Sequence, residues 1–355
     1  LYDEKATSKL TQFGLKLISF ISETINVAKD NISLTEGQKI LTDNFLKKKR
    51  IIVYIDDLDR GWEGKKEDII RISALLNAIR DLSNENSGLL FKVSLRSDVY
   101  YLVRTSDEST DKIEGSVVWC KWTNHEILVL LIKRILTYFG DSVDENTLMK
   151  TPQLHLRFHL ERVMESTFSG RGKWENVYMY KILMSLIRKR PRDLVKLCSL
   201  AAQQAQQTNS PLIKTEHFQA IFEEYSQGRI QDTINEYKSE LPNIENLLFG
   251  MRPTKKQRNA SDGYIYTTAE LIQKLNNIRQ HTNFIFKNGR KASANELAQF
   301  LYKINFLTAR KIVESGEIQR KYFEENRYIS SSFVDFGYDW EVHPAFRWVL
   351  QPENI

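Results

Sequence analysis

The stretch Ile51-Ile52-Val53-Tyr54-Ile55-Asp56-Asp57-Leu58-Asp59-Arg60 decides the fold of this chain. Five apolar residues end abruptly in two adjacent carboxylates. A short apolar run bounded by charge is typical of a buried strand in a parallel sheet. The carboxyl ends of such strands form the edge where α/β sheets bind ligands. We therefore expect Asp56 and Asp57 to lie at a binding edge, where one acid can hold Mg²⁺ and the next can orient an attacking water.

The elements that follow this strand predict an α/β sheet covered by helices. An apolar stripe with acids in its first turn predicts a helix over residues 65–84. Apolar runs predict a second strand at 89–95 and a third at 116–120. Capping-box spacing predicts a helix over 123–139, and helical spacing of apolar residues predicts helices within 1–48.

The strand signal fades after residue 145, and residues 150–250 are predicted to be helical throughout. One strong helix starts at Pro191, because proline fits the first helical turn. The polar stretch 252–263 is predicted to be a linker. Beyond it, short helices followed by two strands rich in aromatic residues indicate a winged-helix-like module. The predicted helices span 268–280, 293–303 and 307–314, and the predicted strands span 322–329 and 332–342.

Composition narrows the class of protein. The 355 residues are 41% hydrophobic and 27% charged, as in chains that form packed cores. The net charge of +6 is compatible with nucleic acid but is spread over a long chain. Two cysteines give no disulfide framework or zinc cluster, so we expect a cytoplasmic protein. No secretory signal and no apolar run long enough for a membrane span are visible, so no membrane partner is expected.

Two arginines are candidates to act with the acidic pair. Arg96 directly follows the second predicted strand, where a cation can reach a nucleotide γ-phosphate beside a metal. Arg192 begins the helix at Pro191, where a mobile helical lid can bring a guanidinium onto phosphates. For each arginine the alternative is a salt bridge, and the sequence leaves both interpretations open.

These motifs together resemble one family. Ile55–Arg60 resembles the Walker B element of the KAP and STAND classes of P-loop NTPases, which are AAA-related ATPases of signalling and bacterial anti-phage defence. Arg96 matches the sensor arginine of that family, and Pro191-Arg192-Asp193-Leu194 resembles its second sensor in the helical lid. The segment Tyr338–Phe346 is similar to the end of winged-helix domains in this group. The resemblance covers most of residues 50–350, and its Walker B part is the most specific.

The resemblance implies an ATPase with ATP and magnesium as cofactors, working as a conformational switch. Asp56 would coordinate Mg²⁺ and Asp57 would position or activate water. Arg96 and Arg192 would bind the phosphates and assist catalysis. Asp59 and Arg60 would be structural or would contact a neighbouring subunit. The implied domains are the P-loop NTPase core at 1–145, a helical lid at 146–250 and a winged-helix-like domain at 265–355.

One departure from the family is serious. Such enzymes need a Gly-x-x-x-x-Gly-Lys-Ser/Thr loop to cradle the phosphates, and the sequence contains none. The stretch Ser169–Trp174 has glycines and a lysine but lacks the spacing, the hydroxyl residue and a preceding strand. The expected fold is therefore a partial P-loop NTPase sheet that begins inside its domain. Whether this chain turns over ATP stays open, because the missing loop would have to be present in the intact protein or another polypeptide.

Two further functions remain as alternatives. The first is a non-enzymatic nucleic-acid-binding or scaffolding protein with an ATPase-like shape. The second is a metal-dependent nuclease that uses Asp56, Asp57 and Asp59. A homo-oligomer and an effector protein are partners by analogy only. DNA is a candidate partner of the C-terminal module, through the basic residues Arg290, Lys291, Lys303, Arg310 and Lys311.

Overall fold

The chain divides into two compact units, Leu1–Trp119 and Cys120–Ile355. The helices predicted within 1–48, and Arg60, lie outside the residues that the structure describes, and the domain boundaries at 145 and 250 stay predictions. The computed structural model describes residues 50–59, 61–106, 108–254, 263–314, 318–325 and 337–351.

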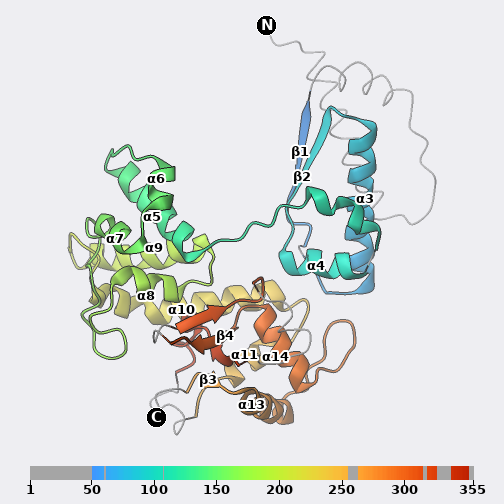
Figure 1. The fold of residues 1–355 in the computed structure, drawn as a ribbon. Coiled ribbons are helices and arrows are strands. Elements are labelled where there is room, and N and C mark those ends of the chain that lie inside the picture. Colours follow the sequence, from blue (N-terminus) through green and yellow to red (C-terminus); the bar gives the residue numbers. More distant parts are fainter. Residues whose placement is uncertain are drawn as a thin grey trace. The chain divides into compact units, whose positions relative to one another are not determined.

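The first unit contains a small parallel sheet (Figure 1). β1 (Ile51–Ile55) pairs in parallel with β2 (Leu89–Val93), with Ile51 opposite Leu89. Parallel strands need a crossover connection, and the helix α3 (Lys66–Glu85) supplies it. These three elements are the predicted strand, helix and strand, so the parallel arrangement of the opening stretch is confirmed.

The burial of β1 differs from the prediction. Within the described residues, α3 and its neighbours cover one face of the strand, and the residues of the other face stay accessible. Ile52 is 47% exposed, Tyr54 is 76% exposed, and Leu90 on β2 is 38% exposed. Side chains alternate between the two faces of a strand, so a single covering layer buries only every second residue. The expected burial on both faces is therefore wrong for this part of the structure.

The predicted third strand at 116–120 is also wrong. After β2 the chain forms the helix α4 (Ser97–Ser106) and then a 3₁₀ helix, η2 (Glu108–Ser116), followed by irregular backbone. Val117 packs against the core of this unit, whereas Val118 is 84% exposed. One valine of the apolar run is therefore packed and the next is exposed, and the described backbone at 117–120 is irregular.

The second unit begins with a helical part. Its first helix has the predicted capping box, in which Thr123 and Glu126 bond each other's backbone N–H at 2.6 and 3.1 Å. Buried side chains from Ile127 to Tyr225 form one core, whereas those from Ile230 to Met251 belong to a second core that includes the sheet described next. The helices are α5 (Asn124–Tyr138), α6 (Glu145–Lys150), α7 (Gln153–Leu160), α8 (Met179–Leu186), α9 (Pro191–Gln207), α10 (Thr215–Tyr237) and α11 (Ile244–Gly250).

A four-stranded antiparallel sheet with two helices completes this unit, in the spatial order β3-β6-β4-β5. The helices α13 and α14 confirm the predicted ones to within a residue. The strands are β3 (Ile265–Tyr266), β4 (Leu307–Ile312), β5 (Ile318–Lys321) and β6 (Asp339–Val342), the helices are α13 (Thr268–His281) and α14 (Ala294–Lys303), and the 3₁₀ helix η3 spans Pro344–Phe346.

Two predictions fail in this sheet. Residues 307–314 were predicted to be helical, yet 307–312 form β4, because this segment pairs with a strand on each side. A short apolar run does not by its periodicity distinguish strand from helix. The strand predicted at 322–329 begins in a turn, and 326–336 lie outside the described residues. Part of the predicted linker, 255–262, also lies outside them.

The helical and sheet parts of the second unit share buried contacts. Ala345 and Trp348, which follow β6, pack into the helical core. The Tyr322 hydroxyl donates a hydrogen bond to the Ile187 carbonyl at 3.5 Å. The sheet part is therefore held against the helical part by these side chains and by the end of α10 and α11, whose buried residues belong to the core of the sheet part. None of the helices in the described part is long and apolar enough to cross a membrane.

Candidate functional site

Asp56 lies at the carboxyl end of β1, as the sequence predicts, and a residue from the neighbouring strand holds it. The Ser94 hydroxyl, just past the end of β2, donates a hydrogen bond to the Asp56 carboxylate. The Asp57 backbone N–H donates another at 2.9 Å. These two bonds, the one from Ser94 first, lower the pKa of Asp56, so its exposed carboxylate is ionised at neutral pH. Ser94 carries no recognisable signal in the sequence, because its role depends on the register between the strands.

Asp57 is exposed and has an uncommon backbone conformation. Its φ is +58°, in the left-handed region that aspartate tolerates better than most side chains. Such a conformation costs roughly 1–3 kcal/mol and tends to persist where a site requires it. The strands remain paired up to this turn, since the Ser94 N–H donates to the Ile55 carbonyl at 2.9 Å. The turn therefore starts directly at the rim of the sheet.

Arg96 reaches the same rim but is engaged by two acids. Its guanidinium bonds Asp98 at 2.7 and 3.1 Å and lies 3.4 Å from the Asp59 carboxylate. Asp98 belongs to the first turn of α4, and Asp59 follows β1. The ion pair that the sequence left open is thus present. Arg96 thus links the segment after β1 to the first turn of α4. Asp59 pairs with this guanidinium and does not join Asp56 as a further metal ligand.

Arg192 is exposed in the first turn of α9, in the other unit of the chain. The residue beside it, Asp193, is fully buried instead. The motif Pro-Arg-Asp-Leu therefore splits into an accessible cation and an enclosed acid, and the buried acid was missed by sequence reasoning.

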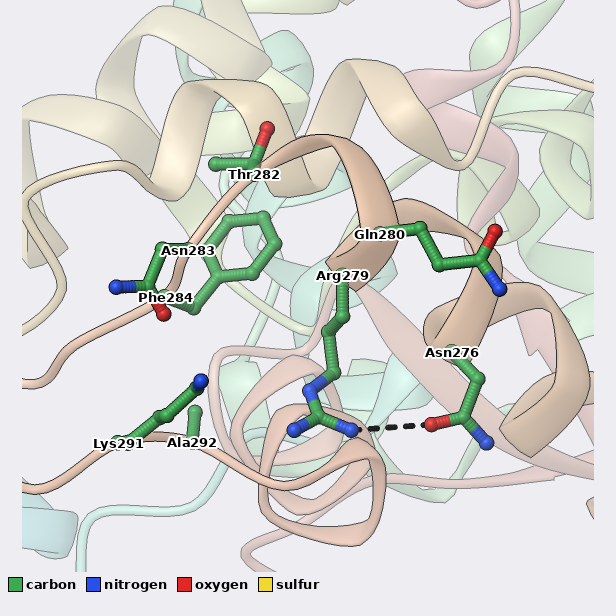
Figure 2. A pocket seen from close by; sticks show the side chains of 8 residues that line it. All are labelled: Asn276, Arg279, Gln280, Thr282, Asn283, Phe284, Lys291 and Ala292. Carbon is green, nitrogen blue, oxygen red and sulfur yellow. Dashed lines mark hydrogen bonds between the residues drawn. The ribbon is translucent and has the colours of Figure 1, made fainter.

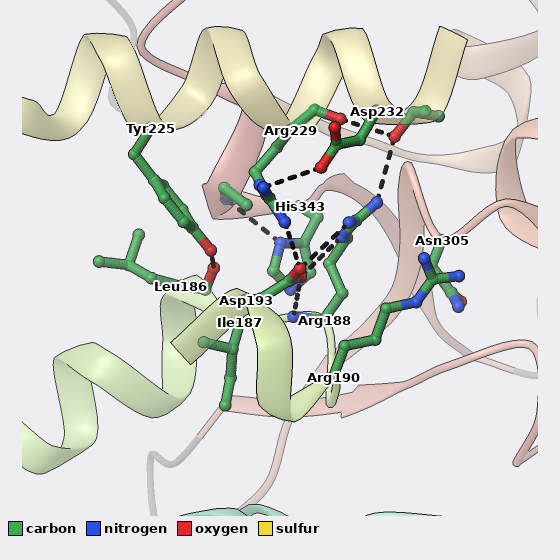
Figure 3. A network of polar contacts seen from close by, with 12 residues as sticks. Leu186, Ile187, Arg188, Arg190, Asp193, Tyr225, Arg229, Asp232, Asn305 and His343 are labelled. Carbon is green, nitrogen blue, oxygen red and sulfur yellow. Dashed lines mark hydrogen bonds and ion pairs between the residues drawn. The ribbon is translucent and has the colours of Figure 1, made fainter. Parts of the chain in front are cut away.

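Asp193 is held by two buried arginines (Figure 3). Arg188 bonds both of its carboxylate oxygens, at 2.9 and 3.3 Å, and Arg229 from α10 bonds one of them. Burial alone would raise the pKa of Asp193, but Arg188, then Arg229 and Arg190, hold that pKa well below its usual range. The carboxylate is charged, and its partners come from residues 5 and 36 positions away in the chain.

A second layer of contacts completes this network. Arg188 also donates to the Thr233 hydroxyl at 3.1 Å, and Arg229 pairs with Asp232 at 2.8 Å. Arg190 pairs with Glu236 at 3.2 Å. Every one of these partners lies on α10, so the network fastens the start of α9 to the second half of α10.

His343 occupies the junction between the helical and sheet parts. It is fully buried, and its Nε2 lies 3.0 Å from the Tyr322 hydroxyl, while its Nδ1 accepts the Ala345 N–H at 3.2 Å. Burial, followed by the positive charges of Arg320 and Arg188, lowers the pKa of His343 to about 3. The imidazole is neutral at physiological pH and serves as a fixed hydrogen-bonding group.

The distribution of metal-ligating side chains in the described residues bears on the alternative functions. Across the part of the chain that the structure describes, no cluster of three or more His, Cys, Asp or Glu side chains could hold a metal ion. The nuclease alternative, which needs three carboxylates together, therefore finds no support among these residues. The glycine-containing stretch Ser169–Trp174 lies outside helices and strands, as the sequence predicts.

Comparisons with known proteins add two findings. A family model described as "FunZ-associated C-terminal helical domain" matches residues 154–234, the segment from α7 to α10. A protein of Escherichia coli K12 named "Putative transposon gamma-delta 80.3 kDa protein" is 21% identical over 321 residues. That alignment covers 86% of this chain but 42% of the relative, so the chain spans less than half the relative's length. No solved structure matches the chain. Residues 154–234 are thus similar to a known helical domain.

Proposed function

We propose that the rim formed by β1 and β2 is the magnesium-binding part of a P-loop-type ATPase site. The observation that carries the proposal is the hydrogen bond from Ser94 to Asp56 at the carboxyl ends of two parallel strands. That edge is where α/β sheets bind ligands. An ionised carboxylate beside a hydroxyl offers the hard oxygen donors that Mg²⁺ takes, usually with several waters retained. The donor set therefore fits the metal that the resemblance implies.

The other residues have distinct roles in this proposal. Asp57, next to Asp56 on the strained turn, would orient the attacking water. Arg96 would contact the terminal phosphate by exchanging its bonds to Asp98 and Asp59 for bonds to phosphate oxygens. Arg192, exposed at the start of α9, is the proposed lid cation. The bound magnesium would neutralise the phosphate charge.

The proposal requires a phosphate-binding loop from elsewhere. The sequence of this chain contains no such loop, so its own residues do not suffice to cradle a triphosphate. We propose that the intact protein or a partner polypeptide provides it. The use of ATP as a switch in bacterial defence or signalling, with an effector or a second copy as partner, rests on the family resemblance alone.

Calorimetry with ATP and magnesium tests the function. We expect the intact gene product to bind and hydrolyse ATP, and this chain alone to bind it weakly or not at all. In the intact protein Asp56→Asn should weaken magnesium-dependent binding, whereas Asp57→Asn should lower turnover at least 100-fold with binding retained. Glu85→Gln is the matched control, because Glu85 is exposed at the end of α3, before β2 begins.

Retained turnover in Asp57→Asn would contradict the assigned role of that acid. Absence of nucleotide binding by the intact protein would overturn the proposal as a whole. The second candidate would then apply, a protein that keeps the ATPase shape and binds nucleic acid or other proteins without turnover. The engagement of Arg96 by two acids favours that candidate, because Asp98 and Asp59 compete with phosphate for this guanidinium in the present conformation.

A further inference from the structure

A basic segment of the second unit carries charge that the ATPase proposal does not use. Residues 271–295, from α13 to the start of α14, contain five lysines and arginines and no aspartate or glutamate. The same segment has many asparagines and glutamines, whose amides both donate and accept hydrogen bonds. A run of cations and amides without acids is the composition expected of a surface that meets polyanions.

The structure gathers part of this segment around an open pocket of about 350 Å³ (Figure 2). Arg279 lines it from the last turn of α13, and Lys291 lines it from the strand-like segment that precedes α14. The side chains of both residues extend toward the same opening in the figure. The other polar groups that line it include Asn276, Gln280 and Asn283.

A short hairpin fixes the position of Lys291. Ile285 and Lys291 form an antiparallel bridge, and the Phe286 N–H donates to the Arg290 carbonyl at 2.9 Å. The turn closes at Gly289, whose φ of +85° is one that glycine adopts without strain. Phe284, 1% exposed, anchors the base of the hairpin and forms an apolar wall of the pocket. The cations of the pocket are therefore presented by ordered backbone.

Some basic residues in and near this segment form ion pairs with carboxylates of the chain, whereas among the described residues the two cations of the pocket do not. Lys303 bonds Glu240 at 2.6 Å, Arg310 lies 3.8 Å from the buried Glu341, and Arg290 pairs with Glu296. Arg279 instead donates to the neutral Asn276 amide oxygen at 3.0 Å. Lys291 is exposed. Within the described ranges no carboxylate forms an ion pair with either pocket cation. Hydrogen bonds from Ser293 lower the pKa of Glu296 most, and the charges of Arg290 and then Arg279 make smaller contributions.

We propose that this pocket, together with the hairpin, binds the phosphodiester backbone of a nucleic acid. Arg279 and Lys291 would neutralise backbone phosphates, and the amides of Asn276, Gln280 and Asn283 would bond phosphate or sugar oxygens. Of the five basic residues predicted from the sequence, Lys291 is kept, whereas Arg290, Lys303 and Arg310 form ion pairs with carboxylates of this chain. Lys311 lies over the ring of Tyr338, and Arg279 is added to the set. The site would recognise the phosphate backbone through these charges and amides.

Fluorescence anisotropy with a short labelled duplex, and with one of its strands, tests this proposal. Wild type should bind with an affinity that falls as salt rises from about 50 to 200 mM. The variant Arg279→Gln/Lys291→Gln should bind about tenfold more weakly and show a salt slope smaller by roughly 1–2. The charge-conserving Arg279→Lys/Lys291→Arg should retain most of the affinity.

The control removes the same charge from another place. Lys150→Gln/Lys196→Gln neutralises two exposed lysines on α6 and α9, and it should leave the salt slope close to that of wild type. Equal losses in the two double variants would overturn the proposal, because net charge and not this pocket would then govern binding. Wild-type protein that binds neither DNA form, or that binds only inorganic phosphate, would overturn it as well. The relative affinities of duplex and single strand identify the preferred form.

Discussion

Asp193 shows how one buried charge is tied to its neighbours. Its carboxylate is unexposed and lies between Arg188 and Arg229, which are also buried. The three charges stabilise one another only together, because a buried guanidinium that loses its anion keeps its desolvation cost without the compensating attraction. The stability of this region therefore depends on a single carboxylate that compensates two buried arginines.

We expect Asp193→Asn to lower the free energy of unfolding by roughly 3–5 kcal/mol, since two buried arginines would then face an uncharged amide. Denaturant titration measures the change. Asp232→Asn is the matched control, because Asp232 pairs with the same Arg229 but is 56% exposed, and such pairs contribute about 1 kcal/mol or less. Similar losses of unfolding free energy in both variants would show that burial does not increase the contribution of the Asp193 ion pairs.

At the level of elements, Asn305 joins the end of α14 to the start of β4. It is 2% exposed with a φ of +56°, the left-handed conformation common just beyond a helix end. Its side chain accepts the Phe323 N–H at 3.3 Å and donates to Glu324 at 3.0 Å. The residue therefore fixes both the turn between the two elements and the segment that follows β5.

Substitutions at Asn305 should rank in a specific order. Asn305→Gly keeps the backbone conformation and loses the side-chain bonds, so we expect a cost of about 1–2 kcal/mol. Asn305→Ala loses the bonds and adds strain at positive φ, so its cost should be larger by about 1 kcal/mol. Thermal unfolding of the two variants measures the difference. Equal stability of both would mean that φ at this position is not restrictive.

Local signals in the sequence predicted most single elements. The apolar run at Ile51 predicted the first strand, and the capping box at Thr123 marked a helix start to within a residue. Segments whose structure depends on distant partners were missed. β4 is a strand because β5 and β6 flank it, and the irregular segment after η2 lacks such partners. Helix α4 was not predicted from the sequence, although its buried residues Val99, Tyr100 and Val103 lie at helical spacing.

The same division holds for the candidate site. Asp56 and Asp57 could be proposed from the sequence because their chemistry follows directly from their position after an apolar strand. Ser94 could not, because its bond to Asp56 spans 38 residues and depends on the strand register. The Asp193 bond to Arg229 spans 36 residues and was hidden for the same reason. Local composition identifies the residue types, and non-local pairing decides which of them meet.

Over the whole second unit, stability should depend on pH through His343. The folded-state pKa of about 3 lies below the usual value of 6.5, so the unfolded chain binds this proton first as the pH falls. Stability is therefore fully present above about pH 6.5 and declines toward pH 3, by roughly 2–3 kcal/mol between pH 6.5 and 4.5. His343→Gln should flatten this part of the profile, as measured by urea unfolding at several pH values.

The exposed His281 provides the control, and His281→Gln should keep the wild-type profile. NMR gives an independent check on the same group. The ring signals of His343 in the folded protein should stay unchanged between pH 7 and 4.5. A titration of those signals near pH 6 would contradict the proposed neutral, buried imidazole.

The ring of Trp348 stacks on Phe222, with centroids 4.3 Å apart, and lies 5.7 Å from Trp174. Phe222 and Trp174 belong to the segment that the family model matches, while Trp348 lies more than a hundred residues beyond its end. A fragment trimmed to residues 154–234 would leave aromatic surface bare and would be prone to aggregate. If this helical domain were transferred to another protein, its exposed aromatic surface would need to be covered either by the segment that contains Trp348 or by another apolar side chain.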